Sequence, residues 1–132
     1  MTNWVNCMLI VVGKQDRLRE FMEYSKGHND TYGDQALQAD RYPTDRPTIF
    51  YDVSVNYLPI DTNHKNCEII FSFYSNNSPP NECIYVMSQK YNDLIFKLFY
   101  VETVNGWSGE FFVVNEYVIY EIHRDDRVSG FG

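Results

Sequence analysis

Alternating apolar and polar residues in the middle of the chain predict two long strands. Between residues 48 and 57, one face holds Ile49, Tyr51, Val53, Val55 and Tyr57. Residues 67–74 repeat the pattern, with Cys67, Ile69, Phe71 and Phe73 on one face. A period of two is typical of a strand with one buried face. We therefore expect these two sets of side chains to point into the core.

An apolar run and a helical pattern precede these strands. Residues 7–12 are apolar and predict a strand. Residues 15–26 then place Leu18 and Phe21 at helical spacing, and Gly27 follows as a stop signal. The N-terminal region therefore predicts a strand, a turn and an amphipathic helix.

A second helix is expected after the second long strand. Ser78 can cap it, because a serine oxygen accepts a hydrogen bond from free backbone N–H groups, and Pro79 and Pro80 suit the first turn. The inward stripe of this helix is Ile84, Met87 and Tyr91.

The last third of the chain predicts an antiparallel meander. Its strands are residues 94–103, 107–114 and 117–124. Asn105-Gly106 separates the first two strands and favours a type I′ turn. The polar, glycine-rich residues 125–132 predict a flexible tail.

Residues 28–47 form a long polar connection between the first helix and the first long strand. Gly33, Pro43 and Pro47 interrupt regular structure there, and residues 35–39 are expected to be partly helical. A connection of this length inside a compact domain is usually either mobile or functional.

Together these elements predict one domain over residues 1–132, of the α+β class. The order strand, helix, two strands, helix, strand is that of a ferredoxin-like βαββαβ sandwich, here with a C-terminal antiparallel meander extension. Both helices then lie on one sheet face, which leaves the other face for solvent or a partner.

Composition and charge narrow the class of function. The chain has 132 residues, 44% of them hydrophobic, and a formal net charge of −7. No apolar run is long enough to span a bilayer and the N-terminus lacks a signal-peptide pattern, so the sequence predicts a soluble, cytoplasmic protein. An acidic chain repels nucleic acid and favours basic partners.

Candidate catalytic and metal-binding residues lack supporting motifs. Cys7, Cys67 and Cys83 are widely spaced and are expected to be free, buried thiols. His64 and Cys67 form an isolated HxxC pair, and the triplet His123-Arg124-Asp125 has no other kinase motif around it. We therefore expect no enzyme, no metal site and no cofactor.

Nucleic-acid binding on an aromatic sheet face is an alternative that the sequence leaves open. Residues 109–113, Gly-Glu-Phe-Phe-Val, echo the signature of RNA-recognition domains without its basic first residue. Glu110 stands where a phosphate would approach, so affinity for nucleic acid is expected to be weak.

Acidic residues supply the candidate partner-binding site. They fall on the meander and its edge and on the long connection, and Trp107 after the Asn105-Gly106 turn is a candidate anchor. The site residues are Glu102, Trp107, Glu110, Glu116, Glu121, Asp125, Asp126, Asp30 and Asp34. The plainer interpretations are a solvated acidic surface that aids solubility and a Trp107 that packs across the meander.

Several short motifs resemble one family of mobile-element proteins. Asn3-Trp4 and Asn6 open the chain, and residues 71–75, Phe-Ser-Phe-Tyr-Ser, lead into Ser78-Pro79-Pro80. This layout resembles the YubB ferredoxin-like family of phage and plasmid accessory proteins. The chain departs from that family at Asn77, where the family usually carries tryptophan, and it lacks the family's Trp-Gly-x-Lys-Trp stretch.

The resemblance implies no enzymatic activity or cofactor. Together with the acidic charge, it predicts a phage or mobile-element accessory protein that inhibits a host defence effector, of anti-CRISPR or anti-restriction type, by stoichiometric binding through acidic surface. The expected partner is a basic host protein or nucleoprotein in the host cytoplasm. A structural homo-oligomeric phage protein is a further alternative, because the last strands can pair edge to edge as a homodimer.

Overall fold

The computed structural model describes residues 3–29, 33–46, 48–59 and 66–125. Its elements follow one another along the chain as β1 (Trp4–Lys14), α1 (Gln15–Ser25), β2 (Gly27–Asn29), β3 (Gly33–Gln35), a 3-10 helix (Ala39–Arg41), β4 (Tyr51–Pro59), β5 (Asn66–Asn76), α2 (Asn81–Lys90), β6 (Ile95–Glu102), β7 (Trp107–Val114) and β8 (Tyr117–Asp125). No helix in this part of the chain is long and apolar enough to cross a membrane.

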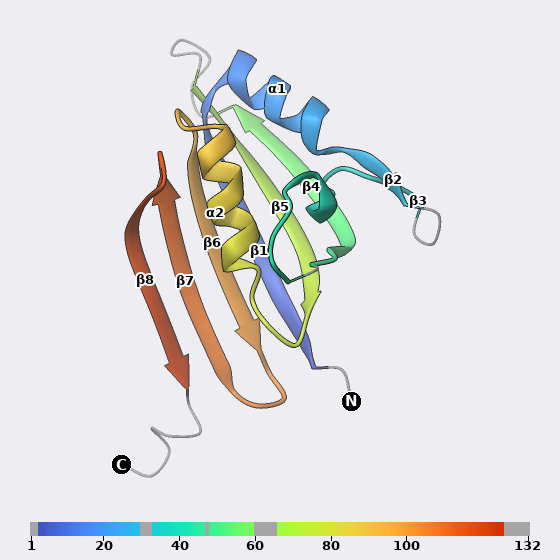
Figure 1. Ribbon diagram of the computed structural model, residues 1–132, viewed down its shortest axis with the longest axis vertical. Helices are drawn as coiled ribbons and strands as arrows, with labels where there is room; N and C mark the ends of the chain where they lie inside the picture. The colour runs from blue at the N-terminus through green and yellow to red at the C-terminus, as the bar shows by residue number, and fades with distance from the viewer. Residues whose placement is uncertain (1–2, 30–32, 47, 60–65, 126–132) are drawn as a thin grey trace.

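Six strands form one antiparallel sheet, and α1 and α2 both pack on the same face of this sheet (Figure 1). The strand order is β4-β5-β1-β6-β7-β8, so the N-terminal strand lies inside the sheet and β4 and β8 form its edges. The short strands β2 and β3 pair with each other in a separate two-stranded sheet.

The core lies between the helices and the central strands. Odd-numbered residues of β1 are buried there together with those of β5, because alternate side chains of a strand share a face. Phe21 of α1 stands in the middle, with its ring centroid 6.1 Å from that of Phe71 and 5.6 Å from that of Phe96. Burying a phenylalanine of this kind stabilises the fold by roughly 1.5–3 kcal/mol.

The predicted ferredoxin-like βαββαβ sandwich is wrong as a fold class. Strands dominate the chain, and one six-stranded antiparallel sheet carries only two helices, of 11 and 10 residues, so the class is closer to all-β. The physical reason is that β7 and β8 add two strands to the sheet, and two short helices do not cover a sheet of six strands. Helix contacts concentrate on β1, β5, β6 and β7, so the helical layer is incomplete.

The predicted elements themselves lie close to those observed. The meander strands at residues 94–103, 107–114 and 117–124 correspond to β6, β7 and β8 within two residues at each end. The second helix differs at its start, because α2 begins at Asn81 and no side chain caps it. Ser78 does not have the expected capping role, and its carbonyl instead accepts a hydrogen bond from Ser75 Oγ at 2.7 Å.

The face predicted for the start of the first long strand is wrong, because β4 contains a β-bulge. Tyr51 pairs with Tyr74 and Ser54 with Ser72, so two residues of β4 lie opposite Phe73 alone. The extra residue reverses the alternation, and Asp52 has a left-handed backbone with φ of 53°. Consequently Phe50 is buried in place of Tyr51 and Ile49 is exposed.

The turns of the meander also differ from expectation. Four residues separate Glu102 from Trp107, and within Asn105-Gly106 only Gly106 has positive φ, so this turn is not type I′. The two-residue turn joins β7 to β8 at Asn115-Glu116, where both residues have positive φ, 50° and 67°. That pair of angles is the signature of type I′ geometry.

The long connection packs onto α1 within its described residues. Leu37 and Tyr42 are almost fully buried, and the Tyr42 hydroxyl is hydrogen-bonded to Ser25 Oγ. Arg41 Nε donates to the carbonyl of Tyr24 at 2.9 Å. The partly helical stretch expected at residues 35–39 is displaced, because β3 ends at Gln35 and a 3-10 helical turn begins only at Ala39 and runs to Arg41.

Candidate functional site

The face of the large sheet opposite α1 and α2 carries the candidate site; we call it the open face. Its residues alternate with the core residues along each strand. Met8 and Val101 are 37% and 40% exposed on the neighbouring strands β1 and β6. Ile95 and Tyr74 are each 40% exposed on the same face. The open face therefore carries accessible apolar side chains, with Met8 and Val101 on its central strands and Ile95 and Tyr74 nearer the strand ends.

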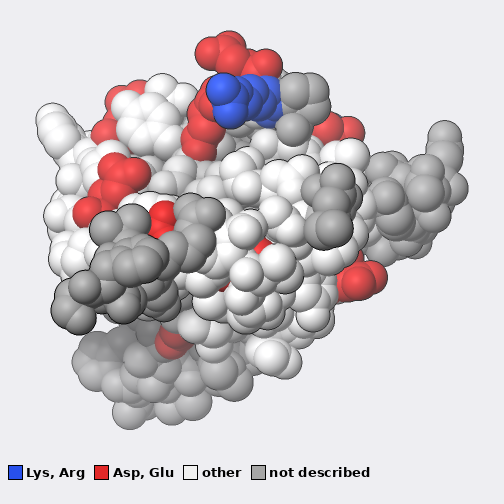
Figure 2. Space-filling model, turned by 90° about the horizontal axis from the view of Figure 1, so that it is seen from below, with Lys and Arg blue, Asp and Glu red and all other residues white. Residues whose placement is uncertain are grey.

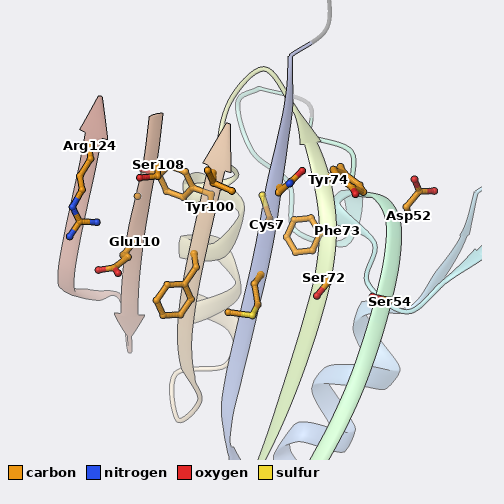
Figure 3. Close-up of a pocket in the computed structure, with 15 residues that line it drawn as sticks. Cys7, Asp52, Ser54, Ser72, Phe73, Tyr74, Tyr100, Ser108, Glu110 and Arg124 are labelled. Carbon is orange, nitrogen blue, oxygen red and sulfur yellow. The ribbon is translucent and has the colours of Figure 1, made fainter. Parts of the chain in front are cut away.

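A shallow pocket of about 610 Å³ crosses the open face from β4 to β8 (Figure 3). Neutral polar side chains, among them Ser72 and Ser108, line it beside the apolar Met8 and Phe99. Its charged lining residues are Asp52, Glu110 and Arg124. Figure 3 shows Asp52 on one side of the pocket, with Glu110 and Arg124 on the opposite side. The arrangement is an apolar centre with a few charges at the margin.

Three aromatic rings continue this surface across β6, β7 and β8. The ring centroids of Phe99 and Phe112 are 5.4 Å apart, and those of Phe112 and Tyr120 are 5.5 Å apart. Lys97 Nζ lies 5.7 Å from the centroid of Phe112. The row therefore presents a continuous aromatic strip with one cation above it.

Glu102, one of the predicted partner-binding acids, is completely buried. Its two carboxylate oxygens accept hydrogen bonds from the backbone N–H groups of Val104 and Asn105, at 2.9 and 2.8 Å. Charge-assisted bonds of this kind hold the turn between β6 and β7. Glu102 therefore belongs to the turn and not to a surface patch.

The other predicted acids on the meander are divided between the two sheet faces. Glu110 lines the pocket on the open face. Glu121 accepts a hydrogen bond from Asn81 at 3.4 Å and Glu116 one from Gln89 at 3.0 Å, so both lie beside α2. At the end of the molecule seen in Figure 2, acidic side chains form separate groups with uncharged residues between them. The structure does not bring these acids together into one patch.

Trp107 packs across the meander, in line with the plainer interpretation. Its ring centroid is 6.0 Å from that of Tyr100 and 5.5 Å from that of His123. Trp107 pairs with Asp125 at the end of β8. Asp34 lies on β3, and Asp30 and Asp126 lie outside the described residues, as do residues 126–132 of the expected tail.

The predicted free thiols are confirmed as buried side chains. None of Cys7, Cys67 and Cys83 forms a disulfide bond, and all three side chains are buried. Burial raises the pKa of Cys7 to about 11, although a hydrogen bond with Ser75 opposes the shift. Burial also raises the pKa of Cys83 to about 12. These two thiols stay protonated near neutral pH and are poor nucleophiles.

The metal-binding and kinase-like motifs do not assemble into sites within the described chain. No group of three or more His, Cys, Asp or Glu side chains there is placed to hold a metal ion, and His64 lies outside that part. In the triplet His123-Arg124-Asp125, neighbouring residues of β8 point to opposite faces. His123 contacts Tyr100 on the face that carries the helices, whereas Arg124 lines the pocket on the open face.

Sequence reasoning missed the open-face residues. The signal was present in residues 7–12, where the positions between the core residues are also apolar, as at Met8 and Ile10. Such a run is typical of a strand covered on both faces. The helices cover only one of them.

No known family model, curated protein or solved structure matches this chain. The resemblance to the YubB family therefore stays a prediction from the sequence motifs.

Proposed function

We propose that this protein acts by stoichiometric binding of another protein through the open face of its sheet. The single observation that supports this proposal is the set of accessible apolar side chains at the centre of that face, including Met8 and Val101. Contact of contiguous apolar surface with water is unfavourable in free energy, and such a surface typically marks an interaction site. An apolar centre with a charged margin is also the usual anatomy of a protein interface.

We carry the expected partner class over from the sequence: a host defence effector of CRISPR or restriction type, met in the host cytoplasm. The proposed surface changes, because the acidic residues first considered are scattered, and Glu102 is buried. Glu110, Asp52 and Arg124 then serve as the polar margin, which tunes specificity and association rate.

A matched pair of valine substitutions tests the surface. Val101→Asp places a charge at the apolar centre, and Val104→Asp places the same charge in the turn after β6, where Val104 is 72% exposed. We expect Val101→Asp to weaken binding at least roughly tenfold, because a charge must then be desolvated, and Val104→Asp to leave it unchanged. Met8→Lys should repeat the loss from the neighbouring strand.

Binding is measured by calorimetric titration against purified CRISPR effectors and restriction nucleases. A parallel assay measures how far each variant inhibits nucleic-acid cleavage by these enzymes. Thermal unfolding of each variant verifies that it is folded. Equal binding by the Val101 and Val104 variants, both folded, would show that the open face is not the binding surface.

Single-stranded nucleic-acid binding is the second candidate, and the aromatic strip of Phe99, Phe112 and Tyr120 favours it. Bases stack on exposed rings, and Lys97 and Arg124 supply positive charge on the same face. Fluorescence anisotropy with labelled oligothymidine at low salt tests it. If the protein binds the oligonucleotide and Phe99→Ala loses this binding, the result favours this function over protein binding.

Self-association is the third candidate, because β8 is an edge strand with exposed apolar residues. Tyr117 and Ile119 are 70% and 65% exposed. Unpaired backbone groups at such an edge readily accept another strand. Light scattering after size exclusion distinguishes a monomer from a homodimer, and Ile119→Lys should dissociate the dimer if β8 forms it.

A further inference from the structure

Three aromatic rings meet at one end of the open face. The ring centroid of Trp4 lies 4.9 Å from that of Tyr51, with an interplanar angle of 79°. The corresponding values for Trp4 and Tyr74 are 6.4 Å and 76°. These rings come from the neighbouring strands β1, β4 and β5. Together with Asp52 they line a pocket of about 510 Å³.

The arrangement of the rings suits a positively charged group. Trp4 stands nearly perpendicular to both tyrosines, so the ring faces turn in different directions around the pocket. Each ring face carries partial negative charge and attracts a cation, with tryptophan the strongest of the three aromatic types. Asp52 adds a full negative charge to the lining.

Two local backbone features hold the walls of the pocket. The bulge at Asp52 turns Tyr51 away from the core and onto the open face, at the cost of a left-handed backbone at Asp52. Next to Trp4, Asn3 N donates to Asn77 Oδ1 at 2.7 Å, and Asn77 N donates to the carbonyl of Asn3 at 2.8 Å. These reciprocal bonds position the start of β1 beside the end of β5.

The pocket is accessible and continuous with the candidate surface. Trp4 is 45% exposed. Asp52 and Tyr74 line both this pocket and the larger one at the centre of the open face. A ligand that covers the open face therefore also reaches the three rings.

We propose that Trp4, Tyr51, Tyr74 and Asp52 form an aromatic cage that binds an alkylammonium or guanidinium group. The source of that cation is a lysine or arginine side chain of the protein bound on the open face, and this part of the proposal rests on the proposed function. The net charge of −7 favours a basic partner, and the cage gives one of its cations a defined position.

The test uses the intact protein and small cations as probes. Choline is titrated at constant ionic strength and compared with 3,3-dimethylbutan-1-ol, its uncharged isostere. The NMR signal of the Trp4 indole N–H reports binding, and the Trp107 indole on the other sheet face is the internal control. We expect choline to shift the Trp4 signal at concentrations roughly tenfold lower than the isostere does, and to leave Trp107 unchanged.

Two variants separate the cage from a general apolar contact. Trp4→Leu should abolish choline binding. Because this variant lacks the indole, binding is measured by the NMR shift of the Tyr74 backbone amide. Asp52→Asn should weaken choline binding several-fold while it keeps the fold, because asparagine tolerates the left-handed backbone. A shift of Trp4 by both probes at equal concentrations, or by neither, would overturn the cage.

The source of the cation is tested with Nα-acetyl-lysine methylamide and Nα-acetyl-arginine methylamide. Binding of either one, lost in Trp4→Leu, supports a partner side chain. Binding of choline alone overturns that source and leaves a cage for a free quaternary ammonium compound. These titrations need no protein partner, so a failure of Val101→Asp to weaken partner binding would overturn the proposed function and not the cage.

Discussion

The Tyr100 hydroxyl oxygen lies 3.0 Å from Nδ1 of His123, across the intervening strand β7. Gly109 lies between them, paired with Tyr100 on one side and with His123 on the other. The phenol ring occupies the space that a side chain at Gly109 would fill. Burial raises the pKa of Tyr100, with the charge of Glu121 acting in the same direction, so the hydroxyl stays protonated at neutral pH.

Gly109→Ala is expected to destabilise the protein. A Cβ there would lie 2.1 Å from Tyr100 Oη and 2.5 Å from the backbone oxygen of Ile122. Both the ring and strand β8 must move, which costs about 1–3 kcal/mol of unfolding free energy. Urea unfolding measures the change.

Gly27→Ala is the matched control for that substitution. Its Cβ would lie 3.3 Å from Cγ of Gln38, a flexible side chain that can move aside. We expect a change within about 0.5 kcal/mol. Equal effects of the two substitutions would contradict the packing described for Tyr100.

Glu102→Ala should destabilise the turn between β6 and β7. The substitution leaves the partly buried N–H groups of Val104 and Asn105 without their acceptor, at an expected cost of about 1–3 kcal/mol. Glu102→Gln keeps one acceptor and should cost less. Thermal unfolding measures both, with Glu110→Ala on the open face as the control that changes little. A fully stable Glu102→Ala protein would argue against the structural role of this carboxylate.

Glu116→Gly should stabilise the hairpin of β7 and β8. Glu116 has φ of 67°, which glycine adopts without strain. The gain is reduced by loss of the hydrogen bond from Gln89, so we expect a net increase of about 0.5 kcal/mol in unfolding free energy. Glu116→Ala loses the same hydrogen bond and keeps the strain, and it should be less stable than the parent. The reverse order of the two variants in chemical denaturation would refute this account.

The stability of the fold should decrease at high pH because of Cys7. Its pKa is raised from the ordinary value of 9.0 to about 11 by burial, so the unfolded chain loses this proton first as the pH rises. Stability from this thiol is complete below pH 9 and is lost between pH 9 and 11. Chemical denaturation should show that the unfolding free energy decreases less between pH 9 and 11 for Cys7→Ala than for the parent protein.

Thiol labelling offers a second measurement of the same burial. At pH 8, Cys7 and Cys83 should react slowly with a disulfide reagent in the folded protein and rapidly after unfolding. Fast labelling of either residue in the folded protein would contradict the described core.

The sequence by itself determined where most strands and helices lie. Alternation over residues 67–74 and helical spacing around Leu18 and Phe21 arise from local geometry, since each residue must face either the core or solvent. The meander could be predicted for the same reason. The type I′ geometry of its two-residue turn could not, because Asn115-Glu116 adopts positive φ without a glycine.

Only the tertiary structure decided which surfaces are available. The bulge at Asp52 reversed the facing of Tyr51, and one such insertion moves every preceding side chain of the strand to the other face. Trp4, Tyr51 and Tyr74 are distant in sequence and meet only because β1, β5 and β4 are neighbours in the sheet. Burial of Glu102 likewise depends on the turn that its own carboxylate holds, and charge counting along the chain carries no information about that contact.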